Sequence, residues 1–543
     1  MTQLLHQLRG REGARRAVRG DGETAINVAF YREARDDRPR RPRANAGTRP
    51  DDHHRHGRRR QHRHRPRGNR GPHDVVGPAE DERVEQSFVN LGSELNTVAA
   101  SSDDTRSVAL GLADANGGVS LVESGHITVT ASGLEDPIID EPIRAIEYRD
   151  GETVVAYEGG GVFRGTGAQA RIVSAPQAEY RQDAFRLPIT RLEGVESVSN
   201  DRVRLSKVRS DRPSHDIPSV AGRFVTITIE SPYYAGWAAH YERQVGDQYV
   251  TVDHANQTVA VLLGQPDPDG SYDGAVTAVG DVLDNGGNPS VNGSISATGN
   301  VSISCEAPAN CTGGEEVDLR PLDDDIAYLF ETSAEDARSI DGSTLENGTY
   351  YADELLRDDD LEVDLSEGDV TVLVDGNIGL DNAKIEVVDG AGTDHVARVY
   401  TTGDVAMGGG SGGVTVESDD PQRFQLYGTS EMKFAIGQGT FTGTIYAPRD
   451  EPAEGTNELV DEYLNNADCS PEADWADVCI GTGSVDFTGS IISGPMSIAQ
   501  NAELTYDRSL STVEPTIAIP PEHLPPKLNH LTVVVHEVAV ESE

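Results

Sequence analysis

The sequence predicts a mainly β protein, in which a short N-terminal helix leads to an antiparallel β-sandwich and then to a right-handed β-solenoid. Three patterns predict this order. An apolar stripe of helical period follows residue 80, and short alternating strands separated by turns fill residues 102–265. Brief Val, Ile and Thr runs punctuated by Gly, Asn and Asp then fill residues 274–510.

Residues 1–80 differ in charge from everything that follows. They hold 20 Arg, no Lys and 10 Asp or Glu, whereas residues 81–543 hold 26 Lys or Arg against 81 Asp or Glu. The segment has no hydrophobic period and is predicted to be disordered. Three interpretations are open: a basic arm for nucleic acid, a His-rich metal-binding tract, or a segment translated in the wrong reading frame. The last is considered because CGN arginine codons, read one base along, become GNN codons for Val, Ala, Gly, Asp or Glu. With almost no aromatic residue to stack on bases, no nucleic-acid partner is expected.

A helix is predicted over residues 81–101. Its apolar residues recur at steps of four, three, four and three, which places them on one face. A helix of this kind buries that face against its own domain. The residues of the stripe are Val84, Phe88, Leu91, Leu95 and Val98.

The sandwich is predicted over residues 102–265 and forms a head domain. One short helix is expected inside it at Tyr234–Gln244, with Trp237 and Tyr241 on the buried side. A turn-rich linker over residues 266–273 follows. Its acids miss the spacing of a calcium-binding loop and are interpreted as solvated: Asp267, Asp269 and Asp273.

Residues 274–510 are predicted to stack as solenoid coils. Phe441–Ile445 returns as Phe487–Ile491, an internal repeat that such coils would explain. A helix over residues 321–337 is expected to cap the stack, and residues 449–482 form an insertion between coils. A second β-sandwich is the alternative. The tail, residues 511–543, is expected to be extended, and its lone apolar run, Leu531–Val535, is a candidate edge strand.

The four cysteines form two close pairs, Cys305 with Cys311 and Cys469 with Cys479. Two local disulfides fit these spacings better than a four-Cys zinc site, which prefers two to four residues between ligands. Disulfides imply an oxidising location. Four unrelated thiols are the other possibility. No metal and no cofactor is expected.

Five Asn-x-Ser/Thr motifs are candidate glycosylation sites. Four of them fall between residues 292 and 347, which suits a glycosylated surface region. The five asparagines are Asn256, Asn292, Asn300, Asn310 and Asn347.

Catalytic motifs match only by letter, and no catalytic residue is predicted. Gly409–Gly413 spells G-x-S-x-G but precedes a strand, whereas a nucleophile elbow precedes a helix. Ser430–Lys433 matches the S-x-x-K motif, which requires a helix to bring Ser and Lys to one side, but the surrounding residues alternate as in β-strands. An acid cluster on one solenoid face could cleave glycans, yet clustered acids are expected in so acidic a chain. The acids and one histidine considered are Asp375, Asp381, Asp389, Asp404 and His395.

The acidity, the four lysines and the heavy use of Asp, Gly, Thr and Val resemble proteins of salt-loving archaea. Several sequence segments also resemble an uncharacterised family of haloarchaeal surface proteins whose members begin with the N-terminal segment of archaellins and type IV pilins. Other segments resemble a β-solenoid module that is often joined to members of this family. The former are Asp81–Ser101, Ala145–Gly151, Tyr157–Arg164 and Ser231–Trp237; the latter are Gly348–Asp353, Ile445–Pro448 and Ala502–Asp507.

The resemblance implies a non-enzymatic cell-surface protein, pilin-like or adhesin-like, which is membrane-anchored in relatives. Its expected partners are other surface or pilus-like subunits and glycans. The apolar helix that should precede the stripe at Val84 is absent or out of frame here, and no signal or transmembrane segment is found. A secreted polysaccharide-active solenoid enzyme and a nucleic-acid-binding protein are the alternatives.

Overall fold

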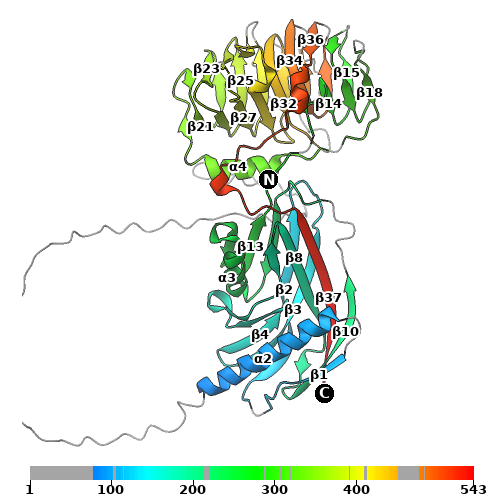
Figure 1. Ribbon diagram of the computed structural model, residues 1–543, viewed down its shortest axis with the longest axis vertical. Coiled ribbons are helices and arrows are strands. Elements are labelled where there is room, and N and C mark those ends of the chain that lie inside the picture. The colour runs from blue at the N-terminus through cyan, green and yellow to red at the C-terminus, as the bar shows by residue number, and fades with distance from the viewer. Residues whose placement is uncertain are drawn as a thin grey trace, which may run out of the picture.

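The computed structural model places the chain in two β regions, one above the other in Figure 1. We call them the head, residues 77–268 with 530–542, and the stacked-strand domain, residues 274–506. The mainly β prediction is confirmed. The structure describes residues 77–101, 105–113, 115–211, 219–268, 270–286, 289–305, 309–317, 319–389, 392–408, 412–449, 476–481, 483–499 and 501–543.

Two sheets form the head, and their inner faces share one core. Ile127 and Ile143 of the larger sheet pack with Phe185, Ile189 and Val533 of the smaller one, as expected of a sandwich. The larger sheet is antiparallel and contains, in spatial order, β12 (Val250–Asp253), β13 (Thr258–Leu263), β11 (Val225–Glu230), β2 (Gly118–Ala131), β3 (Ile139–Asp150), β4 (Thr153–Glu158), β5 (Gly161–Arg164) and β6 (Arg171–Ser174), with β9 (Ser197–Val198) beside β2.

The smaller sheet contains the C-terminal strand at its centre, which corrects the prediction of an edge strand. β37 pairs in antiparallel fashion with β10 and in parallel fashion with β8. The tail is extended, as expected, but it completes the head. The order of the sheet is β1 (Thr105–Ala109), β10 (Arg202–Asp211), β37 (His530–Ser542), β8 (Ala184–Gly194) and β7 (Glu179–Arg181).

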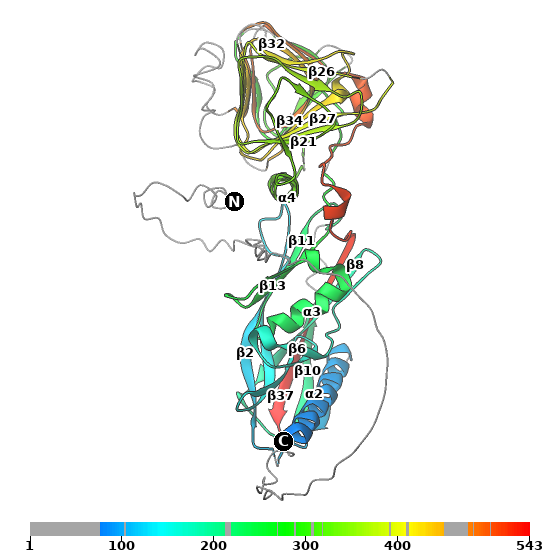
Figure 2. The same ribbon diagram turned by 90° about the vertical axis from the view of Figure 1, so that its left-hand side faces the viewer.

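Two helices pack on the head sheets. The first, α2 (Gly77–Ala100), begins four residues before the predicted start, and its whole predicted stripe is buried. The stripe contacts Tyr148 and Tyr157 of the larger sheet and Leu205 of the smaller one. The second, α3 (Tyr234–Val245), confirms the helix expected from Tyr234. Figure 2 shows both helices lying across the head.

Three parallel sheets form the walls of the stacked-strand domain. Figure 2 shows their strands overlying one another around a common core. Every strand pairs in parallel with the strand one coil away, which is the pairing that the predicted β-solenoid requires and not that of a second antiparallel sandwich. The right hand of the coil stays a prediction.

The first two sheets run in the following spatial order. The first sheet contains β18 (Cys311–Gly313), β17 (Ile295–Ala297), β14 (Val276–Ala278), β34 (Val485–Ser493), β32 (Gly439–Tyr446), β30 (Phe424–Gly428), β27 (Ala397–Thr401), β24 (Val370–Val374), β21 (Gly348–Ala352) and β19 (Arg338–Ser339). The second contains β15 (Val282–Asp284), β35 (Met496–Ile498), β33 (Val478–Ile480), β31 (Phe434–Ile436), β28 (Val405–Gly408), β25 (Ile378–Asp381) and β22 (Leu355–Arg357).

The third sheet shares two long strands with the first. β32 and β34 contribute their N-terminal halves to it before they bend. Its other strands are β16 (Ser290–Asn292), β36 (Ala502–Thr505), β29 (Gly413–Val416), β26 (Lys384–Val388), β23 (Leu361–Asp364) and β20 (Thr344–Leu345).

The internal repeat lies in register on β32 and β34. Phe441 pairs with Phe487, and their rings stack with centroids 4.9 Å apart. Gly443 and Gly489 lie opposite each other at the bend of these strands, with φ of 155° and 153°. The repeat is therefore the same structural position in two adjacent coils.

The chain does not wind the stack from one end to the other. It enters at β14, winds outward to β18, and crosses to the opposite end at β19. From there it winds back until β34, β35 and β36 pair with β14, β15 and β16. β33 belongs to this stack, so the predicted insertion 449–482 is shorter than expected at its C-terminal end.

The helix predicted to cap the stack, α4 (Asp323–Ser333), lies instead between the two regions. Ile326 and Leu329 of α4 share a cluster with Phe224 and Leu262 of the head. The same cluster contains buried tyrosines from the outer side of the first sheet. The cluster joins head, helix and stack into one packed contact.

The returning tail covers these tyrosines on its way to the head. Tyr400 Oη donates to the carbonyl of Thr516 at 2.8 Å and accepts from the amide of Ala518 at 3.0 Å. Tyr427 Oη accepts from the amide of Thr516 at 3.0 Å. Leu510, Ile517 and Ile519 complete the apolar contact. The tail is thus fixed to the stack before it enters the head as β37.

Candidate functional site

One corner of the stack holds a pocket of about 400 Å³, where the third sheet turns into the first. Asp389 and Glu417 follow β26 and β29 on neighbouring coils, and Asp420 and Arg423 precede β30. Asp420 accepts from the amide of Gln422 at 3.1 Å and pairs with Arg423 at 3.1 Å. The pocket therefore brings together three carboxylates and one guanidinium, which can hydrogen-bond a polar ligand.

The four aspartates singled out in the sequence do not converge. Asp375 accepts from Thr402 Oγ1 at 3.1 Å, and Asp404 accepts from the amide of Lys433 at 3.0 Å, both between the first and second sheets. Asp381 lies at the end of β25, and only Asp389 reaches the pocket. His395 bonds the carbonyl of Leu365 at 2.8 Å. The acids are spread over all three corners of the coil.

A buried ion network includes Lys433 of the segment Ser430–Lys433, which matches the S-x-x-K motif. Arg449 Nη1 lies 2.9 Å and Lys433 Nζ 3.7 Å from opposite oxygens of Asp477, whose side chain is fully buried. Ser430 donates to Asp323 at 3.0 Å instead. Ser430 and Lys433 thus have different acidic partners.

A second buried pair, Arg320 with Asp325, lies at the junction of head and stack. Arg320 also donates to the carbonyl of Gly222 in the head at 2.9 Å. Burial raises the pKa of Asp325 to about 7, although the neighbouring arginine opposes this shift. This pair was not predicted, because single Arg and Asp residues in a sequence do not show which side chains will be buried together.

The head contains a buried carboxylate, Glu158, where the segments Tyr157–Arg164 and Ser231–Trp237 contact each other. Ser231 Oγ donates to Glu158 Oε1 at 2.7 Å, and Trp237 Nε1 donates to the same oxygen at 2.8 Å. Burial raises the pKa of Glu158. Tyr233 Oη donates to Glu147 at 2.7 Å beside it. These segments therefore form an internal polar cluster that fixes α3 to the sheet.

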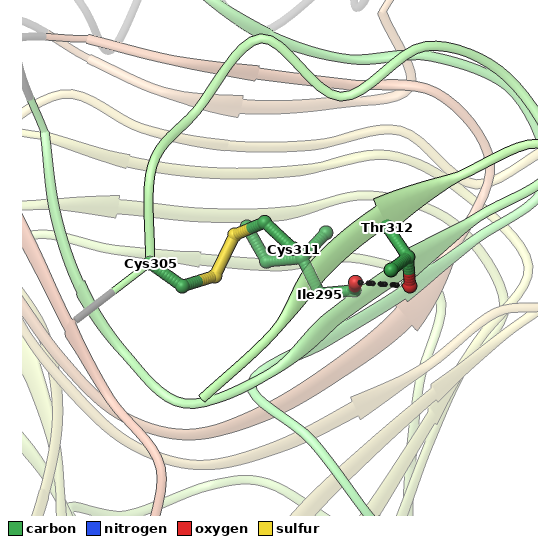
Figure 3. Close-up of a disulfide and its surroundings, with 4 residues drawn as sticks. All are labelled: Ile295, Cys305, Cys311 and Thr312. Carbon is green, nitrogen blue, oxygen red and sulfur yellow. Dashed lines mark hydrogen bonds between the residues drawn. A yellow bond between two sulfur atoms is a disulfide. The ribbon is translucent and has the colours of Figure 1, made fainter. Parts of the chain in front are cut away.

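The predicted disulfide Cys305–Cys311 is present, with Cα atoms 5.6 Å apart (Figure 3). It joins the terminal strand β18 to Cys305, which bridges to Val291 of β16. Cys479 is also disulfide-bonded. Its predicted partner Cys469 lies outside the described residues.

All five candidate glycosylation asparagines are exposed. Asn256 lies on the head in the turn between β12 and β13. The other four lie on coils near the ends of the stack, at the end of β16, after β17, before β18 and before β21: Asn292, Asn300, Asn310 and Asn347.

Several sequence predictions concern residues that the structure leaves out. These are nearly all of the predicted disordered segment 1–80, most of the insertion 449–482, Asp269 of the linker and residues 409–411 of the glycine-rich turn, which leads into strand β29. Among the described residues, no group of three or more His, Cys, Asp or Glu side chains could hold a metal ion. None of their helices is long and apolar enough to cross a membrane.

Two families match the chain, each over part of its length. The model of a family of unknown function (DUF7289) matches residues 78–279, which run from α2 through β14. The model of a domain of unknown function (DUF7305) matches residues 309–513, which run from β18 to the returning tail. No curated protein and no solved structure matches the chain. The chain is thus similar to two families of unknown function, whose matches are separated by residues 280–308 of the stacked-strand domain.

Proposed function

We propose that this chain is a non-enzymatic structural or binding protein of a haloarchaeal cell surface, pilin-like or adhesin-like, which presents the stacked-strand domain on a fixed head. The return of β37 into the head carries the proposal. Because the head is completed by residues on both sides of the stack in the sequence, the stack is an insertion whose two chain connections both lead to the head. Such a connection suits a rigid projecting module.

The charge distribution supports a role in strong salt. Residues 274–513, which include the whole stack, hold 46 Asp or Glu against nine Lys or Arg. Such a surface repels itself in dilute buffer but stays hydrated when ions screen it. The Cys305–Cys311 disulfide suits an oxidising location outside the cytoplasm. Other surface subunits and glycans are the proposed partners.

Localisation tests the proposal directly. Antibodies raised against the purified chain should label intact cells, and protease added to intact cells should remove the labelled protein. A cytoplasmic protein of known location serves as the control for lysis. Recovery of the chain only from the cytoplasmic fraction would overturn the surface role.

A polysaccharide-active enzyme is the second candidate, favoured by the corner pocket. Asp389 and Glu417 would be the reacting carboxylates, and Arg423 would hold an acidic sugar. The test is release of reducing ends from uronic-acid polymers in strong salt. Activity lost in both Asp389→Asn and Glu417→Gln, but kept in the Asp381→Asn control, would establish the enzyme. Absence of any release would leave the structural role.

A nucleic-acid role would depend on the basic segment, nearly all of which lies outside the described residues. Salt-sensitive DNA binding that disappears when residues 1–80 are deleted would support it. The surplus of acids after residue 80 opposes it, since like charges repel the phosphate backbone.

A further inference from the structure

The stack has two open ends. At one end of the first sheet β18 pairs with β17 and with no other described strand, and at the other end β19 pairs only with β21. Figure 1 shows these two ends on opposite sides of the domain. A strand with one neighbour presents a row of backbone N–H and C=O groups to any chain that can pair with it.

This chain already contains such a junction. The coils of residues 276–313 and those of residues 338–505 are wound separately, and they meet where β14 pairs in parallel with β34. Val276 pairs with Ile491, and Ala278 pairs with Ser493. The open ends offer the same parallel pairing to a second copy. A stable monomer therefore requires a feature that blocks pairing between the ends of different copies.

Three glycosylation motifs lie on the terminal coils. The backbone carbonyl of Asn310 accepts from Ile295 at 2.9 Å, and that of Asn300 accepts from Val282 at 2.8 Å, which holds both residues against the next coil. At the other end, Arg338 of β19 donates to the carbonyl of Asn347 and lies over the ring of Tyr350 at 4.5 Å. Each asparagine is exposed.

The coils between the two ends carry no such motif. From residue 361 to residue 506 the sequence contains no Asn-x-Ser/Thr, although this range holds six Asn. The motifs on the stack therefore lie at its ends and not along its length. Asn292, on the coil next to the β18 end, fits the same distribution.

We propose that N-linked oligosaccharides on Asn300, Asn310 and Asn347 cover the two open ends of the stack and prevent edge-to-edge pairing between copies. The donor would be an oligosaccharide activated on a lipid phosphate. The Asn Nδ2–sugar C1 bond forms, the C1–O bond to the phosphate breaks, and Nδ2 loses a proton. A bulky hydrated chain beside a short edge strand blocks the approach of another strand. The inference depends on the proposed surface location.

The test begins with protein collected from the surface of native cells. Glycopeptide mass spectrometry should find sugar on Asn347 and on at least one of Asn300 and Asn310. Finding all three unmodified on surface-labelled protein would overturn this inference but leave the proposed function intact. Finding the protein only inside the cell would instead overturn the proposed function.

A variant experiment tests the role of the sugars. The combined variant N300Q, N310Q and N347Q should form larger assemblies than the parent chain when both are purified from the native host and measured by light scattering in strong salt. N256Q, which removes the motif on the head, is the matched control and should behave like the parent. An unchanged assembly state in the combined variant, with its folding verified by circular dichroism, would overturn the role in end protection.

Discussion

At the scale of single residues, ion pairs between side chains that are far apart in the sequence stabilise the head. Glu537 lies in β37 with its side chain 6 % exposed, and it binds Arg191 at 2.9 Å and also binds Arg209. Its hydrogen bond with Glu193 and those from the two arginines lower its pKa from 4.5 to about 2. This carboxylate therefore stabilises the fold at pH values above 4.5, and the contribution is lost as the pH falls toward 2.

We expect E537Q to lower the free energy of unfolding by about 2 kcal/mol at neutral pH, because Arg191 and Arg209 lose one anionic partner but keep Glu141 and Asp211. Chemical denaturation at a series of pH values measures this loss. The difference from the parent chain should shrink as the pH falls below about 4.5. E541Q, at an exposed position of the same strand, is the control and should cost little. A loss that is the same at every pH would contradict the assignment.

The residues of the candidate sites show how far sequence reasoning extends. The disulfide Cys305–Cys311 was predictable because the two cysteines are near neighbours in the chain. The contact between Arg191 and Glu537 spans 346 residues, and nothing local indicates it. Of the pocket residues, Asp389 alone was singled out, because acids are too frequent in this chain for their positions to be informative.

At the scale of elements, the bend shared by β32 and β34 depends on glycine. A Cβ atom on Gly489 would lie 1.7 Å from the carbonyl oxygen of Gly443, and its φ of 153° is unfavourable for other residues. We expect Gly489→Ala to destabilise the stack by about 3 kcal/mol or more, since the clash is with backbone. Thermal unfolding measures this loss. Gly118→Ala, where a Cβ has open space, should change little.

The C-terminal strand gives a second prediction at this scale. Deleting residues 530–543 removes the centre of the smaller head sheet, together with core residues such as Val533 and Val538. We expect the head of the shortened chain to be digested rapidly by protease within residues 105–263, whereas the parent head resists. Deletion of residues 541–543 alone is the control and should preserve resistance. An intact head in the longer deletion would show that β37 is dispensable.

Most elements were predictable because their period is local. The stripe of α2 and the buried face of α3 follow from residue spacing along each helix. The repeat of Phe441–Ile445 as Phe487–Ile491 follows from the recurrence of similar residues. α4 was predicted as a helix but misplaced. Its apolar residues show that one face is covered, and they do not show that the covering surface is the head.

At the scale of the whole molecule, the excess of acids controls the response to salt. Residues 81–543 carry 55 more acidic than basic residues. Screening weakens the repulsion among these charges, so we expect the midpoint of thermal unfolding to rise by at least several degrees between about 0.1 M and about 2 M salt. NaCl and KCl at equal concentration should act alike, because screening depends on ionic strength. A midpoint that does not change with salt would contradict this account.

The sequence by itself determined the β content, the helices, the in-register repeat and one disulfide. Each depends on side chains close together in the chain, whose spacing fixes which face is buried. Only the tertiary structure decided that the coils are stacked out of sequence order, that α4 joins the two regions, and that β37 completes the head. These features depend on which distant surface covers each buried face. Periodicity shows that a face is covered, and the packing of the whole chain selects its partner.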